Sequence, residues 1–197
     1  MSMWNRIAVV AASGALVLGA GLGAAPAALA DGPDTPPEVE QRVEACEWIV
    51  LGPGDERWEV GFGKYVLAGL GAYDTDGVDD VYGDDLTAAV EEYQSAEDVP
   101  QSGEFDTATW EHVRADFGEV GPGMQPEPSD LVRAVQYALA EGYGYDVAVD
   151  GYYGPATEGA VREFQGIVGI GADGIVGPVT FRALVTGGAC QELGLAD

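Results

Sequence analysis

One eight-residue pattern occurs twice in the second half of the chain, and each copy constrains the local conformation. Residues 150–157 read DGYYGPAT and residues 173–180 read DGIVGPVT. The Asp-Gly pair favours a tight turn, because glycine accepts a positive φ and aspartate bonds the backbone that follows it. The Gly-Pro pair favours a helix start, because proline at the first helical position lacks only an N–H that has no partner there. The segment therefore predicts two helices, each preceded by a turn.

Apolar residues recur at helical spacing after each proline and also ahead of the first turn. The stripe ahead of the turn stops at Gly142, and glycine is a favourable residue at a helix end. Together the three stripes predict a module of three short helices around a small core, over residues 130–186. The stripe residues are Leu131, Val132, Val135, Leu139, Ala156, Ala160, Val161, Phe164, Ile167, Val168, Phe181, Leu184 and Val185.

This segment resembles the peptidoglycan-binding domain family, a small three-helix module often appended to bacterial wall hydrolases. The resemblance covers about residues 130–185 and implies attachment to the bacterial cell wall, without catalysis by the module itself. The residues that carry it are Gln136, both turn patterns, Ala160, Val161, Phe164 and Gln165.

A weaker copy of the same module precedes this one. Residues 78–113 align with residues 149–184 without a gap, at a constant offset of 71. We therefore expect two tandem modules, the first over residues 58–117. The core positions are kept in the first module, but its turns have changed, so we expect it to act as scaffold and the second module to bind. Matched pairs include Tyr82 with Tyr153, Tyr93 with Phe164, Gln94 with Gln165 and Trp110 with Phe181, whereas Asp80, Asp84 and Leu86 replace Gly151, Pro155 and Thr157.

The rest of the chain divides by composition. Residues 1–30 carry one basic residue, an apolar stretch and an Ala28-Leu29-Ala30 cleavage pattern, which predicts a secretory signal peptide. We expect residues 31–57 to form a disordered lead and an N-terminal helix over residues 38–51. The Pro- and Gly-rich residues 118–129 are predicted to be a linker, and residues 187–197 a C-terminal tail.

Two cysteines, Cys46 and Cys190, lie near the two ends of the mature chain. An even cysteine count in an exported protein favours a disulfide, which would tie the termini together. The predicted fold is therefore all-α, with two tandem three-helix modules and an N-terminal helix closed by this disulfide.

The formal net charge of −26 excludes some partners. Nucleic acid and anionic membranes both require basic surfaces, so neither is expected as a partner. The simplest interpretation of the acidic surface is that it keeps an exported protein soluble.

No candidate catalytic group or cofactor site stands out. His112 is the single histidine, and no nucleophile setting accompanies it. Two cysteines and this histidine are too few for a structural zinc site. The acidic run 74–80 lacks the spacing of a calcium-binding loop, so capping carboxylates are the preferred interpretation. We expect no enzyme activity, no metal and no cofactor.

Four tyrosines lie in or just before the Asp150-Gly151 turn of the second module. A tyrosine ring can lie against a sugar or a stem-peptide methyl group while its hydroxyl hydrogen-bonds. The alternative is that Asp150 and Thr157, with Gln136 and Gln165, only satisfy the turn backbone and that Tyr153 is core. The candidate ligand-binding residues are Tyr143, Tyr145, Asp150, Tyr152, Tyr153 and Thr157.

Three functions remain at this stage. The preferred hypothesis is a secreted, monomeric, non-catalytic protein that binds peptidoglycan and stays associated with the cell wall. The alternative is a secreted adaptor or inhibitor whose acidic surface binds a cell-wall hydrolase or another basic protein. A small hydrolase is the third, disfavoured because two three-helix modules leave no domain large enough to hold a catalytic cleft.

Overall fold

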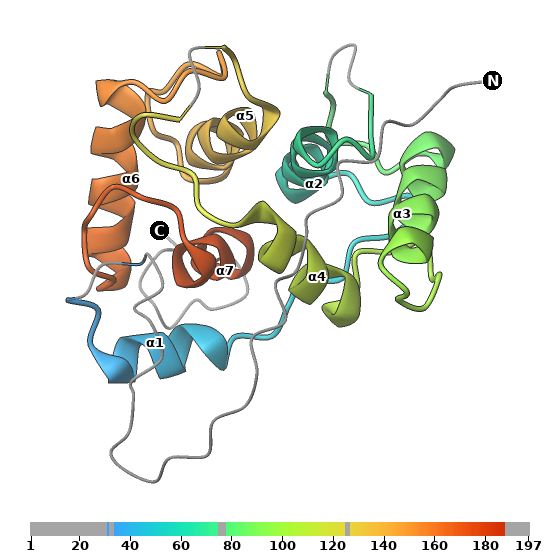
Figure 1. The fold of residues 1–197 in the computed structure, drawn as a ribbon, viewed down its shortest axis with the longest axis horizontal. Coiled ribbons are helices and arrows are strands. Elements are labelled where there is room, and N and C mark those ends of the chain that lie inside the picture. The colour runs from blue at the N-terminus through green and yellow to red at the C-terminus, as the bar shows by residue number, and fades with distance from the viewer. Residues whose placement is uncertain (1–30, 32–33, 75–77, 125–126, 188–197) are drawn as a thin grey trace, which may run out of the picture.

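The chain is described by a computed structural model that covers residues 31, 34–74, 78–124 and 127–187. These residues form helices joined by turns and three isolated β-bridges, so the all-α class is confirmed for the part of the chain they represent (Figure 1). The elements are α1 (Pro37–Glu44), α2 (Trp58–Gly69), α3 (Asp84–Ala96), α4 (Thr107–Phe117), α5 (Asp130–Tyr137), the π-helical turn η1 (Ala138–Gly142), α6 (Pro155–Val168) and α7 (Pro178–Thr186).

Both modules begin their helices as the turn residues predict. Pro155 and Pro178 are the first residues of α6 and α7. The first module lacks these prolines, but the Asp106 side chain accepts a hydrogen bond from the Thr109 N–H at 2.9 Å and so caps α4. Helices α2, α3 and α4 form the first module, and α5, η1, α6 and α7 form the second.

The two modules pack against each other through their first helices, α2 and α5. Glycines of α2 make this approach possible, because a Cβ on Gly61 would lie 2.5 Å from Cε1 of Tyr137 and one on Gly69 would lie 2.8 Å from the Leu131 N atom. The helices run in opposite directions, since Trp58 at the start of α2 contacts Gly142 at the end of η1. Glycines that lower the helix propensity of α2 therefore serve the junction between modules.

An aromatic cluster crosses the same junction. Phe181 of α7 packs against first-module rings, with centroid separations of 5.5 Å to Phe62, 4.8 Å to Phe117 and 6.2 Å to Trp110. These four residues are buried. Burial of large rings is a major stabilising term in small domains, so the two modules share one hydrophobic core.

Equivalent residues of the two modules touch each other across this junction. Trp110 contacts Phe181, its counterpart at the offset of 71. Tyr65 and Tyr137, which occupy matching positions of α2 and α5, have ring centroids 5.4 Å apart. Contact between a position and its own counterpart is the signature of twofold symmetry, so the modules are related approximately by a twofold axis.

The N-terminal segment differs from its prediction in two respects. Helix α1 ends at Glu44 rather than continuing to Leu51, which instead pairs in a β-bridge with Phe105. The described residues of the lead are not disordered. Asp31 is buried, and the hydroxyl of Thr35 accepts a hydrogen bond from the Gly171 N–H at 2.9 Å. This segment is ordered by contacts with the second module, and the composition of the segment itself does not predict such contacts.

The segment predicted as a linker also lies against the second module. Val120 is buried and pairs with Val176 in a β-bridge. The equivalent bridge in the first module joins Leu51 to Phe105. Each module is therefore preceded by an extended arm that pairs with its second turn.

Two predictions concern residues that the structure does not describe. The signal peptide at residues 1–30 and the C-terminal tail with Cys190 both lie outside the described residues, so the signal sequence and the Cys46–Cys190 disulfide stay predictions. Cys46 itself is buried. None of the described helices is long and apolar enough to cross a membrane.

Candidate functional site

The turn between η1 and α6 is built around one buried glutamine. The Gln136 Nε2 group donates to Oδ1 of Asp150 at 2.9 Å, to the Tyr152 carbonyl at 3.0 Å and to the Thr157 hydroxyl at 3.1 Å. Its Oε1 accepts from the Gly151 N–H at 2.8 Å. A buried amide satisfied on both sides fixes the turn, because breaking any of these bonds would leave an unpaired polar group in the core.

The same arrangement recurs, and we call each instance a glutamine-centred turn. Gln165 bonds Asp173, Ile175, Thr180 and Gly174 in the same way. Sequence reasoning aligned Gln94 with Gln165 but assigned it no role, although the constant offset was sufficient to find it. The bonds of Gln94 go to Ser102, Gly103, Glu104 and Thr109.

The first turn of the first module uses a different residue for the same purpose. Lys64 is buried, and its Nζ donates to Oδ1 of Asp79 at 2.5 Å and to the Val81 carbonyl at 2.8 Å. The Lys64–Asp79 ion pair stands where Gln136 bonds Asp150, and Leu86, at the position of Thr157, has no hydroxyl to accept a third bond. No sequence signal identified Lys64. The residue type differs from that of Gln136, and the segment between Lys64 and the turn is one residue longer than its counterpart in the second module.

Asp150 and Thr157 are therefore tied into the turn. Asp150 accepts from the Tyr152 N–H at 2.9 Å, and this bond, together with that from Gln136, lowers the pKa of the Asp150 carboxyl. Thr157 is buried beneath the turn. The backbone-supporting role of Gln136, Gln165, Asp150 and Thr157 is present in the structure, and a ligand-binding role for Asp150 and Thr157 stays a prediction.

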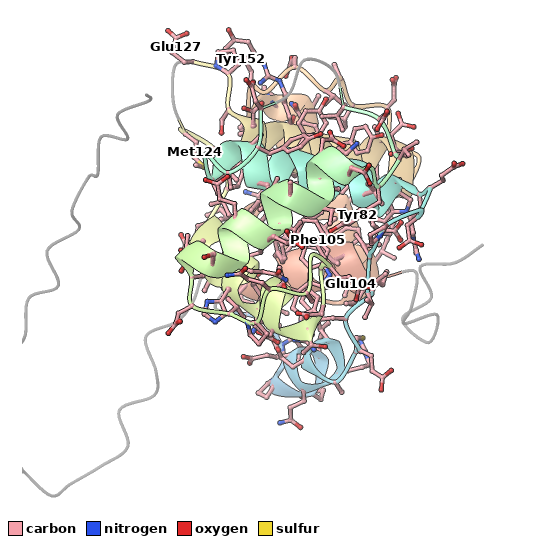
Figure 2. The ribbon with its side chains drawn as sticks, turned by 90° about the vertical axis from the view of Figure 1, so that its right-hand side faces the viewer. Tyr82, Glu104, Phe105, Met124, Glu127 and Tyr152 are labelled. Carbon is pink, nitrogen blue, oxygen red and sulfur yellow. The ribbon has the colours of Figure 1, made fainter. Side chains whose placement is uncertain are left out.

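Tyr152 points outward from this turn, with 49% of its surface exposed (Figure 2). Its backbone is held firmly: the carbonyl accepts from Gln136 and from the Gly154 N–H, and its own N–H bonds Asp150. An aromatic ring on a fixed backbone loses little conformational freedom on binding. This geometry makes Tyr152 the best placed of the six candidates to contact a ligand.

The other three tyrosines have different surroundings. The hydroxyl of Tyr143 donates to the Leu184 carbonyl at 2.6 Å, and its ring lies 4.8 Å from that of Phe164. Tyr153 is partly buried and donates to the Gly174 carbonyl at 2.7 Å. Burial raises the pKa of all three hydroxyls, and Tyr145 is partly exposed beside the turn. Tyr143 and Tyr153 thus have structural partners, and Tyr145 joins Tyr152 as a surface candidate.

The matching turn of the first module has no aromatic ring at the position of Tyr152. Val81 occupies the position of Tyr152 and is 43% exposed. The acidic residues around it have protein partners: Asp79 pairs with Lys64, and Asp80 accepts from the Tyr137 hydroxyl at 2.6 Å. The first module therefore lacks the exposed ring that Tyr152 provides in the second.

His112 lies exposed on α4. Across the described residues, no three of the His, Cys, Asp and Glu side chains are grouped so that they could hold a metal ion.

Comparison with known proteins agrees with this architecture. A family model described as "Putative peptidoglycan binding domain" matches the chain twice, over residues 59–113 and 128–184, which together make up more than half of it. A zinc D-Ala-D-Ala carboxypeptidase of Streptomyces albus G is 46% identical over 57 residues, covering 28% of this chain and 22% of the enzyme. A probable N-acetylmuramoyl-L-alanine amidase of Bacillus licheniformis is 31% identical over 124 residues, covering 53% of this chain and 35% of the amidase.

A third relative, an uncharacterised protein of Kitasatospora aureofaciens, is 44% identical over 61 residues, covering 30% of this chain and 52% of the relative. The chain thus spans between about a fifth and about a half of the length of these curated relatives. No solved structure matches it.

Proposed function

The chain belongs to the peptidoglycan-binding domain family, and from that premise we propose that it is an exported protein that attaches to the bacterial cell wall without cleaving it. The observation that carries this proposal is the tandem family match, whose two segments coincide with the two three-helix modules. Peptidoglycan is thus the ligand class that the family supports.

The non-catalytic part of the proposal rests on the residues themselves. The two relatives with enzyme names align with this chain only in the binding-domain region, so their activities do not transfer. The single histidine, His112, is exposed and has no nucleophile in a triad arrangement beside it among the hydrogen bonds of the described residues. Binding without hydrolysis is the function that this residue set favours.

We place the wall contact of the second module at Tyr152 and Tyr145. Tyr152 combines an exposed ring with a backbone fixed by Gln136 and Asp150. Rings of this kind stack on the apolar faces of sugars and on methyl groups, while the hydroxyl hydrogen-bonds.

Co-sedimentation with purified insoluble peptidoglycan tests the function and the site together. The chain from residue 31 to residue 197 should pellet with the wall, and the Tyr145→Ala/Tyr152→Ala variant should stay largely in the supernatant. Val81→Ala is the matched control, because it removes an exposed side chain from the equivalent turn of the first module. Equal pelleting of all three proteins would move the site elsewhere, and no pelleting of the wild type would overturn the function.

We further propose that export is followed by formation of the Cys46–Cys190 disulfide. The Cys46 carbonyl accepts from Nη2 of Arg182 at 2.7 Å, which puts Cys46 beside the last turns of α7. Helix α7 ends at Thr186, and the four residues from there to Cys190 can span about 13 Å. The disulfide would close the whole loop between residues 46 and 190. Closing a loop of that length adds on the order of 4–5 kcal/mol to the free energy of unfolding in the chain-entropy model. A thiol assay on unreduced protein, unfolded in denaturant so that buried Cys46 is accessible, should find no free thiol, and two free thiols would contradict the disulfide.

A further inference from the structure

The first module contains a cavity of about 640 Å³ that the candidate surface of the second module does not involve. Its lining residues come from the end of α2 and the loop after it, from α3 and from the last turn of α4. Figure 1 shows α3 at one side of the molecule. Its walls combine apolar side chains with three carboxylates. The lining residues are Leu70, Gly71, Ala72, Glu92, Tyr93, Ala96, Glu97 and Asp116.

Backbone hydrogen bonds show which residue of the second module corresponds to the cavity wall. Gly71 N–H bonds the Ala68 carbonyl just after α2, and Gly144 N–H bonds the Ala140 carbonyl just after η1. Both glycines have positive φ, 76° and 72°. The residue before Gly71 is Leu70, and the residue before Gly144 is Tyr143, so these two side chains occupy equivalent positions.

In the second module, the side chain of Tyr143 occupies the space that corresponds to the cavity. The Tyr143 ring packs 4.8 Å from that of Phe164, and its hydroxyl reaches the Leu184 carbonyl. In the first module the counterpart of Phe164 is Tyr93, but Leu70 is too short to extend across α3 as Tyr143 extends across α6. The cavity is therefore the place where the second module has a partly buried tyrosine and the first module has the shorter Leu70.

The carboxylates lie at the mouth of the cavity, where Glu92 and Asp116 are exposed and Glu97 is partly exposed. The Tyr93 hydroxyl donates to Oδ2 of Asp116 at 2.6 Å, and burial, with this neighbouring carboxylate, raises the Tyr93 pKa, so the hydroxyl remains a donor. This bond leaves Oδ1 of Asp116 available as an acceptor. Among the ion pairs of the described residues, none involves Glu92, Glu97 or Asp116.

Apolar walls with unpaired carboxylates fit one type of side chain. Methylene groups can lie along Leu70, Ala72 and Ala96, while a terminal ammonium reaches the carboxylates, because long basic side chains bury their stems and keep the charged end paired or solvated. A carboxylate or phosphate ligand would be repelled here.

We propose that this cavity binds the aliphatic side chain and free ammonium group of a diamino acid in the peptide stems of the wall. This rests on the proposed function and extends it, because it gives the first module a binding role of its own. Attachment would then use an aromatic surface on the second module and an ammonium site on the first, on one rigid body, which favours avidity.

The probe for this site is Nα-acetyl-L-lysine amide, with its Nε-acetylated derivative as the matched neutral control. Titration into the chain of residues 31–197, followed by NMR amide shifts, should give saturable changes confined to the end of α2, α3 and the end of α4. The neutral derivative should give none. Changes of equal size with both compounds, or changes spread over the acidic surface, would overturn the proposal.

Two kinds of variant separate the cavity from general acidity. Leu70→Tyr restores the residue that the second module has, and it should abolish the response to the lysine probe. Glu92→Gln with Glu97→Gln keeps the shape and should weaken binding about fivefold, since exposed ion pairs are individually weak. Glu141→Gln, an exposed acid outside the cavity, should bind like the wild type. Thermal melts of each variant exclude misfolding as the cause.

Co-sedimentation of the same proteins distinguishes this inference from the proposed function. A wild type that pellets with the wall but gives no saturable shift with the probe would overturn the cavity assignment and leave wall binding intact. A wild type that binds the probe but does not pellet would overturn the assignment to wall stems and, with it, the proposed function. The proposal is supported if the wild type both binds the probe and pellets with the wall, and if a smaller fraction of the Leu70→Tyr variant pellets.

Discussion

At the scale of single residues, Asp31 shows how a distant side chain completes a helix. Helix α7 starts at Gly177-Pro178, where the residue before the helix offers no side-chain cap. Asp31 supplies it: Oδ2 accepts from the Val179 N–H at 2.7 Å and Oδ1 from the Thr180 N–H at 2.8 Å. The predicted signal cleavage after Ala30 would make Asp31 the first residue of the mature chain. The new N-terminal residue would then be fixed to the second module.

The pH dependence of stability tests this cap. Burial raises the pKa of Asp31 to about 6, above its ordinary value of 3.8. The native chain then keeps the proton over a range in which the unfolded chain has released it, so the free energy of unfolding should fall as pH rises from about 4 to about 6. The Asp31 share of this fall is on the order of 2–3 kcal/mol.

Denaturant unfolding across that pH range measures this share as the difference between wild type and Asp31→Asn, which cannot titrate. Both proteins should keep residues ahead of Asp31, so that no terminal ammonium lies beside the carboxylate. Parallel pH profiles for the two proteins would contradict a buried, titrating cap.

At the scale of elements, helix α2 carries glycines that local rules count against it. Gly61 lies inside the helix, where glycine is less favourable than alanine by about 1 kcal/mol. Tyr137 of α5 takes the space that a side chain would need. Glycine at this position lowers the helix propensity of α2, but it allows α5 to pack closely against it.

Alanine substitutions at two glycines should therefore act in opposite directions. Gly61→Ala should lower the free energy of unfolding by about 1–3 kcal/mol, because its Cβ would lie 2.5 Å from Cε1 of Tyr137 and 2.8 Å from Oδ1 of Asp80. Gly159 in α6 is the matched control: nothing lies within 4 Å of an added Cβ, so Gly159→Ala should raise stability by about 0.5–1 kcal/mol. Chemical denaturation of both variants checks the signs, and a stabilising Gly61→Ala would refute close packing of α2 on α5.

Features that depend on neighbouring residues could be predicted from the sequence, and features that depend on distant contacts could not. The turns and helix starts at Pro155 and Pro178 depend on neighbouring residues, and they were predicted. The burial of Asp31 depends on a partner 148 residues away, and nothing nearby signals it. Lys64 was missed for a similar reason, because its equivalence to Gln136 appears only in the contacts. The six candidate binding residues stay a prediction, and only coordinates separate exposed Tyr152 from Tyr143, whose ring packs against Phe164.

At the scale of the whole molecule, the tandem repeat has become one body. Phe181 of the second module is fully buried among first-module rings, including Trp110. All three tryptophans of the predicted mature chain, Trp48, Trp58 and Trp110, precede the second module. Each of them also contacts a ring of the second module: Trp48 and Trp110 pack against Phe181, and Trp58 packs against Tyr143. Tryptophan fluorescence therefore reports on the junction between the modules, while helical circular dichroism reports on the helices of both.

Unfolding should consequently be a single transition with the same midpoint for fluorescence and circular dichroism. Phe181→Ala, a change in the second module, should lower the stability measured by both probes, by about 3–5 kcal/mol. Transitions with separate midpoints for fluorescence and circular dichroism would mean that the modules unfold independently.

The most direct measurement is a binding isotherm of residues 31–197 on purified insoluble peptidoglycan, with the soluble fraction assayed in the same samples for released wall fragments. We predict saturable binding and no fragments above the wall-only control. Protein that remains in solution at every wall concentration would contradict wall attachment and favour an adaptor that binds a protein partner. Binding accompanied by fragment release would contradict the non-catalytic function instead.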